Sequence, residues 1–227
     1  MSLDANDRAG QGAATRLQVL ATEHWSLLAT RSLTYTESLA RVTMFLAILS
    51  GAVIALALVA QADHFGPTFI AIAIFVLAVV LFAGVATIGR LMQLNADDFR
   101  WVVAMNRIRH AYLEMHPELE PHFMASPYDD VPGALQTLGI DVTAGRRVGS
   151  ALHVFQTLPG MLSVIVAAVA GAIAALAAIA FAAPPLGVTL ACAVAFVLAV
   201  IVLGMWGRRS VRRSDPSLEP RFPSPKA

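Results

Sequence analysis

The stretch VTMFLAILSGAVIALALVA, residues 42–60, decides the fold because it stays free of charged residues over a length that matches a lipid bilayer. A hydrocarbon core about 30 Å thick needs roughly 20 apolar residues in an α-helix, which rises about 1.5 Å per residue. Three further stretches meet the same requirement, at residues 68–89, 161–183 and 186–206. The sequence therefore predicts an all-α polytopic membrane protein with four transmembrane helices.

The composition of the whole chain agrees with this class. Of its 227 residues, 57% are hydrophobic and only 14% are charged, which is typical of membrane proteins. The formal net charge of +1 gives no long-range field that would attract nucleic acid. The single cysteine, Cys192, lies inside an apolar stretch, so an intrachain disulfide is excluded.

The positions of the basic residues predict how the chain is threaded. All 16 lysines and arginines lie in residues 1–41, 90–160 or 207–227, and none lies in the short connections QADHFGP and PPLG. Basic residues near the ends of spans are retained on the cytoplasmic side. We therefore expect two hairpins, at residues 42–89 and 161–206, in the inner membrane, with both termini and the middle segment in the cytoplasm. No cleaved signal peptide is expected, because no basic leader or cleavage site precedes the first span.

Two amphipathic helices are predicted on the cytoplasmic side. One covers residues 14–41 and continues into the first span, with a stripe at spacings of four and three formed by Ala21, Trp25, Leu28, Ser32, Tyr35 and Leu39. The other begins with Asn95 as its N-cap, ends before Pro117, and has a stripe formed by Trp101, Met105, Ile108, Tyr112 and Met115. Such stripes predict that the two helices pack on each other. The alternative is that either helix lies flat on the lipid headgroups, where Trp and Tyr are also common.

The remaining soluble segments give less regular patterns. Prolines and glycines predict a loop over residues 117–145 with at most one short helix, followed by a helix over residues 142–158. The Pro- and Ser-rich end of the chain, within residues 207–227, is expected to be disordered. Four arginines follow the fourth span directly and are predicted to contact anionic headgroups, at roughly 1 kcal/mol each: Arg208, Arg209, Arg212 and Arg213. In the third span, Gly171 belongs to a series of small residues that favours close helix packing, within one chain or between chains.

The segment NRIRHAYLEMHPELEPHF, residues 106–123, is rich in histidine and glutamate. Its candidate metal ligands are His110, Glu114, His116 and His122. His116 lies about 120° around the helix from His110, and the pair of histidines four residues apart that is typical of helical zinc sites is absent. We therefore favour a polar helix surface formed by Asn106, His110 and Glu114, and we predict no catalytic residues, metal or cofactor.

Two segments of the first half carry a family resemblance: EHWSLLATRSLTYTESLARVTMFLAILSG, residues 23–51, and RLMQLNADDFRWVVAMNRIRHAYLE, residues 90–114. Together they resemble uncharacterised bacterial four-span integral membrane proteins. More loosely, the order helix, two-span hairpin, helix is similar to the SLATT domains, two-span effector modules thought to disrupt membranes as partners of nucleotide sensors. This chain departs from the SLATT pattern by its second hairpin and by the lack of a fused sensor.

These patterns favour a non-enzymatic membrane protein whose cytoplasmic helices mediate assembly or partner binding. The spans carry no ionisable residue, and such residues usually mark proton or substrate pathways. One alternative is a homo-oligomeric pore or membrane effector assembled through the small residues of the third span. A second alternative is a membrane-bound metalloenzyme that uses His110, Glu114 and either His116 or His122.

Overall fold

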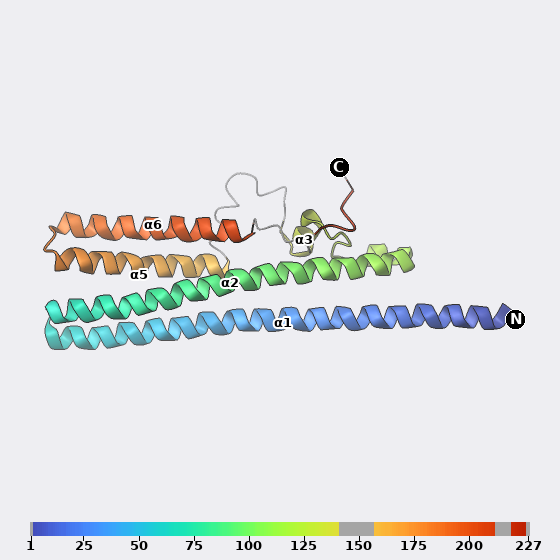
Figure 1. Ribbon diagram of the computed structural model, residues 1–227, viewed down its shortest axis with the longest axis horizontal. Helices are drawn as coiled ribbons and strands as arrows, with labels where there is room; N and C mark the ends of the chain where they lie inside the picture. The colour runs from blue at the N-terminus through green and yellow to red at the C-terminus, as the bar shows by residue number, and fades with distance from the viewer. Residues whose placement is uncertain (1, 141–156, 212–218, 226–227) are drawn as a thin grey trace. The chain divides into compact units, whose positions relative to one another are not determined.

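The computed structural model describes residues 2–140, 157–211 and 219–225, with side chains from Gly10 onward and, in the last helix, up to Gly207. The described elements, drawn in Figure 1, are α1 (Ser2–Asp63), α2 (Pro67–Met115), η1 (Pro117–His122), α3 (Val131–Thr137), α5 (Leu158–Ala180) and α6 (Pro185–Val211). All of these are helical, so the all-α prediction is confirmed for this part of the chain. The helix expected over residues 142–158 falls almost wholly outside the described residues.

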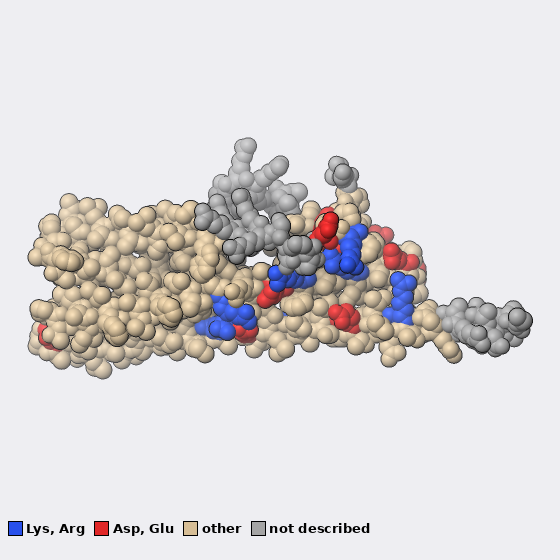
Figure 2. All heavy atoms as spheres, viewed as in Figure 1, with Lys and Arg blue, Asp and Glu red and all other residues tan. Residues whose placement is uncertain are grey.

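Four of the helices, α1, α2, α5 and α6, are long and apolar enough to cross a membrane. This confirms four long apolar helices at the predicted positions. In Figure 2, the described residues of α5 and α6 show no Lys, Arg, Asp or Glu on the visible face. α5 begins three residues before the predicted span because Thr157 caps it: its hydroxyl accepts a hydrogen bond from the Gly160 N–H at 3.3 Å.

The chain divides into two compact units, and each is described by itself. Unit 1 consists of Met1–Thr36, Asn95–Arg147 and Ser214–Ala227, and unit 2 consists of Glu37–Leu94 and Val148–Arg213. Each unit is therefore assembled from segments that are far apart in the sequence.

The core of unit 2 takes side chains from all four long helices. Its most deeply buried members are Phe45 of α1, Ile88 and Leu91 of α2, and Leu162 and Val166 of α5, and Leu203 of α6 joins them. These apolar contacts hold the two hairpins together inside this unit.

Glycines let the helices of unit 2 approach closely at two points. A Cβ at Gly84 would lie 3.0 Å from the Phe45 ring and would collide with Val166. A Cβ at Gly171 would lie 3.1 Å from the Cys192 carbonyl oxygen. The close packing expected of Gly171 thus takes place between α5 and α6 of one chain.

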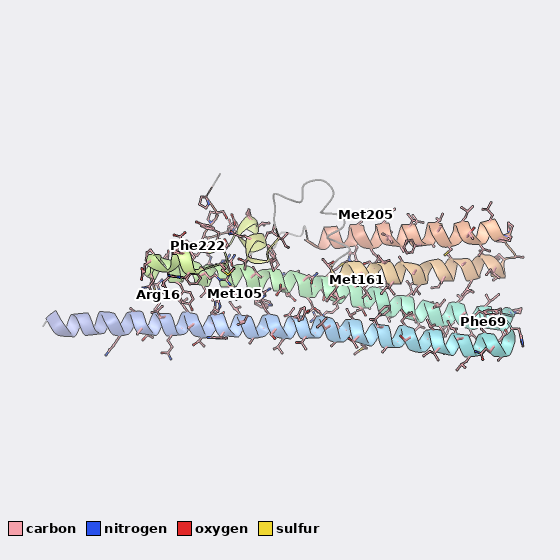
Figure 3. All side chains as sticks on the ribbon, turned by 180° about the vertical axis from the view of Figure 1, so that it is seen from behind. Arg16, Phe69, Met105, Met161, Met205 and Phe222 are labelled. Atoms are coloured by element: carbon pink, nitrogen blue, oxygen red, sulfur yellow. The ribbon has the colours of Figure 1, made fainter. Side chains whose placement is uncertain are left out.

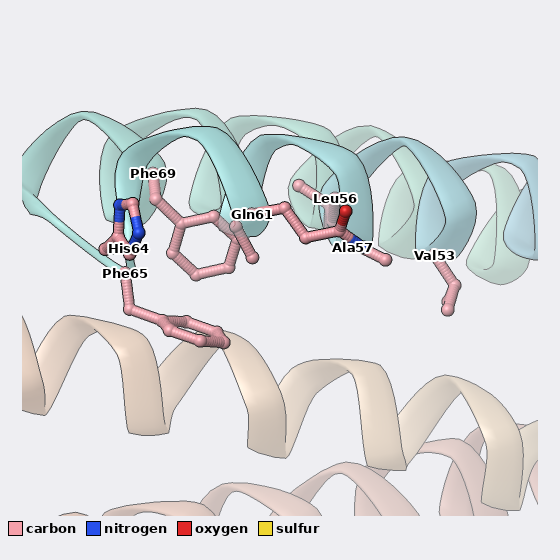
Figure 4. A pocket seen from close by; sticks show the side chains of 8 residues that line it. Val53, Leu56, Ala57, Gln61, His64, Phe65 and Phe69 are labelled. Carbon is pink, nitrogen blue, oxygen red and sulfur yellow. The ribbon is translucent and has the colours of Figure 1, made fainter.

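The turn between α1 and α2 is tight and strained. The Asp63 carboxylate accepts a hydrogen bond from the Phe69 N–H at 2.7 Å, and the Asp63 carbonyl accepts one from the Gly66 N–H at 2.9 Å. His64 and Phe65 have φ angles of 48° and 62°, which non-glycine residues adopt only at a cost. An apolar hollow with a volume of about 820 Å³ lies beside this turn. Figure 4 shows Phe65 and Phe69 among the residues that line it.

Both long helices run without interruption. α1 continues from the polar N-terminal segment into the apolar stretch, as expected. α2 also continues, from Pro67 to Met115, so the prediction that Asn95 caps a separate helix is wrong. The segment around Asn95 contains no glycine or proline, and an asparagine inside a helix costs only about 0.7 kcal/mol relative to alanine.

Within unit 1, α1 faces α2 through a different stripe from the one that the sequence predicts. Leu27 is buried with Met105 and Ile108, and Trp101 and Tyr112 pack against this cluster. The stripe that the sequence predicts for α1 is not packed against α2. Its members Trp25, Leu28 and Tyr35 are 69%, 40% and 64% exposed. The contact stripe of α1 lies one residue earlier, which rotates the helix by about 100°.

A polar contact lies on the same stripe as the buried Leu27. The Arg31 guanidinium lies on the contact stripe and forms two hydrogen bonds to the Asp98 carboxylate of α2, at 2.6 and 3.0 Å. The ring of His24, on the same stripe, lies with its centroid 6.5 Å from that of Tyr112. The inward face of α1 therefore combines the buried Leu27 with this ion pair, and Trp25 and Tyr35 are exposed.

Candidate functional site

The histidine- and glutamate-rich segment does not bring its candidate metal ligands together. Its histidine–glutamate pairs lie 3.7 Å apart at His110 and Glu114 and 3.1 Å apart at His116 and Glu118. Among the described residues, no group of three or more potential ligands is placed to hold a metal ion. The candidate ligands His110, Glu114, His116 and His122 are therefore not brought together.

His110 instead stacks on a residue from the end of the chain. Its ring lies 3.9 Å, centroid to centroid, from the ring of Phe222, with an angle of 21° between the planes. Figure 3 shows Phe222 beside α2, the helix that carries Met105. The described residues 219–225 thus hold defined contacts, and the prediction of a disordered end of the chain is wrong for this segment.

We call residues 219–225 the tail segment. The side chains of Arg208, Arg209, Arg212 and Arg213, which were predicted to contact lipid headgroups, lie outside the described part of the structure.

Asp129 forms the centre of the site that binds the tail segment. Its carboxylate is fully buried and accepts hydrogen bonds from the Arg107 Nε at 2.7 Å, the Arg221 N–H at 2.9 Å and the Phe222 N–H at 2.7 Å. Its own N–H donates to the Phe222 carbonyl at 3.1 Å. One residue therefore binds the main chain of the tail segment from both sides of Phe222.

Asp130 binds the next part of the tail segment and also starts a helix. It is the N-cap of α3, where its carboxylate accepts a hydrogen bond from the Gly133 N–H at 2.9 Å. The same carboxylate accepts hydrogen bonds from the Ser224 N–H and the Ser224 hydroxyl, both at 2.8 Å. We call Asp129 and Asp130 together, with their neighbours Arg107 and His110, the tail-binding site.

Asn106 of α2 fixes the loop that carries the two aspartates. It is fully buried, and its amide donates to the Tyr128 carbonyl at 2.7 Å while its oxygen accepts from the Thr137 hydroxyl at 3.0 Å. A side chain at Gly133 would collide with that same Tyr128 carbonyl. The sequence-based interpretation of Asn106 as a surface residue is therefore corrected: it is a buried anchor.

The electrostatics of the site favour ionised aspartates. Burial by itself would raise the pKa of Asp129, but the N–H groups of Arg221 and Phe222 and the Arg107 guanidinium outweigh this and hold the pKa below its usual value. The pKa of Asp130 is also lowered, because the donors from Gly133 and Ser224 outweigh its burial. Both aspartates are therefore charged at neutral pH, and hydrogen bonds to charged groups are the stronger kind.

A second polar cluster of unit 1 lies between α1 and α2. Burial, followed by the charge of Arg109, lowers the pKa of His24. The buried Nδ1 atom of His24 has no hydrogen-bond partner among the described residues. His24 is therefore neutral at pH 7 and is packed beside a cation.

Sequence reasoning missed the tail-binding site almost entirely. The segment DDVPG offers one local signal, an aspartate before a proline at the start of a short helix, which is a known N-cap pattern. Nothing local indicates that Asp129 binds residues 92 and 93 positions further along the chain.

The contacts of the tail-binding site are mostly with main-chain groups. Its two carboxylates accept four main-chain N–H groups, one hydroxyl and the guanidinium of Arg107. No protein-family model matches the chain, and no curated protein or solved structure matches it either. The resemblance to SLATT domains stays a prediction.

Proposed function

We propose that the chain is a non-enzymatic protein of the inner membrane whose soluble unit mediates assembly or partner binding. The observation that carries this proposal is the tail-binding site, where the buried Asp129 and the partly buried Asp130 hold the tail segment through its main chain. Main-chain hydrogen bonds combined with a side-chain pocket are a general way for proteins to bind peptide segments.

The apolar helices support the membrane part of the proposal. α1, α2, α5 and α6 have the length and composition of membrane spans. The distribution of arginine favours the orientation with unit 1, both termini and the tail-binding site in the cytoplasm. In that orientation the site faces soluble proteins and the soluble parts of other membrane proteins.

Crosslinking in native membranes, followed by affinity capture, tests the proposal. The informative variant is Asp129→Asn, which removes the central charge of the site. The matched control is Asp97→Asn, because Asp97 lies in the same unit and pairs at 2.9 Å with the half-exposed Arg100, without contacting the tail segment. We expect defined crosslinked products with the wild type and with Asp97→Asn, and at least about tenfold less of them with Asp129→Asn.

The proposal is overturned if the wild type gives no defined crosslinked product. It is also overturned if Asp129→Asn leaves the yield and identity of the products unchanged, because assembly would then not depend on the site.

A further inference from the structure

The contacts of the tail segment define a short recognition pattern. The site binds the main chain around Phe222 through Asp129, stacks the Phe222 ring on His110, and takes both the N–H and the hydroxyl of Ser224 at Asp130. Pro223 lies between Phe222 and Ser224 and has no N–H to donate. The contacts of the tail segment given above use no donor at that position. The pattern is an aromatic–proline–serine sequence, Phe222 to Ser224.

Much of the site is positioned by contacts that do not involve the tail segment. Asn106 and Thr137 fix the loop from one side, and the N-cap hydrogen bond of Asp130 fixes it from the other. Arg107 supplies a guanidinium to Asp129 from α2. A site that is organised by other parts of the unit is ready to accept a segment of the same pattern from another molecule.

We propose that the tail-binding site accepts the tail segment of a second copy of this chain, so that two copies exchange tails. Every contact listed above is made by residues that each copy carries, so an exchanged tail forms the same hydrogen bonds as the copy's own tail. Exchange of an identical element is a route to dimers that costs few contacts. This inference rests on the proposed function, and it names the partner.

The first experiment measures whether the site binds a tail that is not covalently attached. The probe is a labelled peptide of residues 217–227, SLEPRFPSPKA, added to the purified full chain carrying Phe222→Ala and Ser224→Ala, whose own tail is weakened. We expect saturable binding, and at least about tenfold weaker binding when the Phe of the peptide is replaced by Ala, which removes the ring stacking and its buried area.

Two controls decide the specificity of this binding. Adding Asp129→Asn to the chain should abolish it, whereas adding Asp97→Asn should not. The wild-type chain should bind the peptide about tenfold or more weakly than the tail-weakened chain, because its own tail competes at a high effective concentration. Absence of saturable binding, or equal binding to the Asp129→Asn chain, overturns the proposal.

The second experiment identifies the second copy as the source of the tail. One tagged copy carries Asp129→Asn, so that its tail is intact and its site is inactive. A differently tagged copy carries Phe222→Ala and Ser224→Ala, so that its site is intact and its tail is inactive. We expect each copy to capture the other when they are co-expressed, and we expect capture to be lost when both copies carry Asp129→Asn.

Capture that persists with Asp129→Asn in both copies would show association through another surface and would overturn the exchange of tails. So would the absence of capture between the complementary copies. If the peptide fails to bind while Asp129→Asn still changes the crosslinked products in native membranes, the exchange of tails is refuted and the proposed function stands.

Discussion

Asp129 is a buried carboxylate whose desolvation is offset by three hydrogen-bond donors. These are the guanidinium of Arg107 and the N–H groups of Arg221 and Phe222. An ionised carboxylate without such partners would be strongly destabilising inside a protein. Two of these three donors come from the tail segment. The protonation of Asp129 and the binding of the tail segment are therefore coupled.

This coupling predicts how binding of the tail segment depends on pH. The pKa values of Asp129 and Asp130 are lowered in the bound state, so binding is complete above the ordinary aspartate pKa of about 3.9 and is lost as the pH falls through the lowered values. Hydrogen exchange at the N–H groups of Arg221 and Phe222, normalised to the free peptide at each pH, measures it. We expect constant protection between about pH 8 and pH 5 and a loss below about pH 4. Protection that persists at pH 2, or that disappears near pH 7, would contradict this.

The residue scale is also where sequence reasoning was least successful. The dense group of histidines and glutamates after Asn106 raised the question of a metal site, and its sequence pattern favoured a polar helix surface there. The structure uses His110 for ring stacking instead. The aspartates that form the site occur as an ordinary acidic pair in a loop, and their partners lie more than 90 residues away.

Among the secondary-structure elements, α1 shows that a sequence can reveal the spacing of a contact stripe without revealing which face of the helix carries it. The apolar spacing of α1 correctly indicated a helix with a stripe. The predicted face contained Trp25 and Tyr35, the largest apolar residues of this segment, whereas the buried face carries Leu27 and the Arg31 that pairs with Asp98. Charge pairing across two helices cannot be read from one helix alone.

Two adjacent leucines test directly which face of α1 is buried. Leu27→Ala removes a side chain that is 6% exposed, and we expect it to lower the free energy of unfolding of unit 1 by about 2–4 kcal/mol. Leu28→Ala removes one that is 40% exposed, and its expected effect is below about 0.5 kcal/mol. Pulse proteolysis of the purified protein, scored on cleavage within residues 95–115, measures both. Equal effects of the two substitutions would refute the contact stripe described above.

A pair of glycines tests the packing of α5 against α6. Gly171→Ala places a Cβ 3.1 Å from the Cys192 carbonyl oxygen, and we expect this crowding to cost about 1–3 kcal/mol. Gly51→Ala is the control, because no atom lies within 4 Å of the added Cβ and alanine is the better helix former by about 0.5–1 kcal/mol. Unfolding in detergent, titrated with SDS, compares the two. A neutral or stabilising Gly171→Ala would contradict close packing at this point.

For the whole molecule, the four apolar helices were predictable because each depends on a long run of one residue class. A run of residues such as 42–60 needs no partner elsewhere in the chain to be recognised. The division into two units was not predictable in the same way, because unit 1 combines three separate segments of the chain. Composition identifies apolar segments, but it does not tell which distant polar segments associate.

The orientation in the membrane gives a prediction at this scale. Topology reporters fused after Lys226 or inserted within residues 120–140 should report a cytoplasmic location, and a reporter inserted between Asp63 and Gly66 should report an external one. The physical reason is that the arginines outside the hairpins are retained in the cytoplasm. A cytoplasmic signal from the turn after Asp63, or an external signal from the tail, would overturn the four-span arrangement.

The distance along the chain between Asp129 and Phe222 also has a consequence for biosynthesis. Phe222 follows Asp129 by 93 residues, and a ribosome adds about 5–20 residues per second. The residues of the tail-binding site are therefore added about 5–20 s before the tail segment, whereas small helical units fold in microseconds to milliseconds. In the proposed exchange of tails, a neighbouring chain that is already finished would then have the first opportunity to occupy the site.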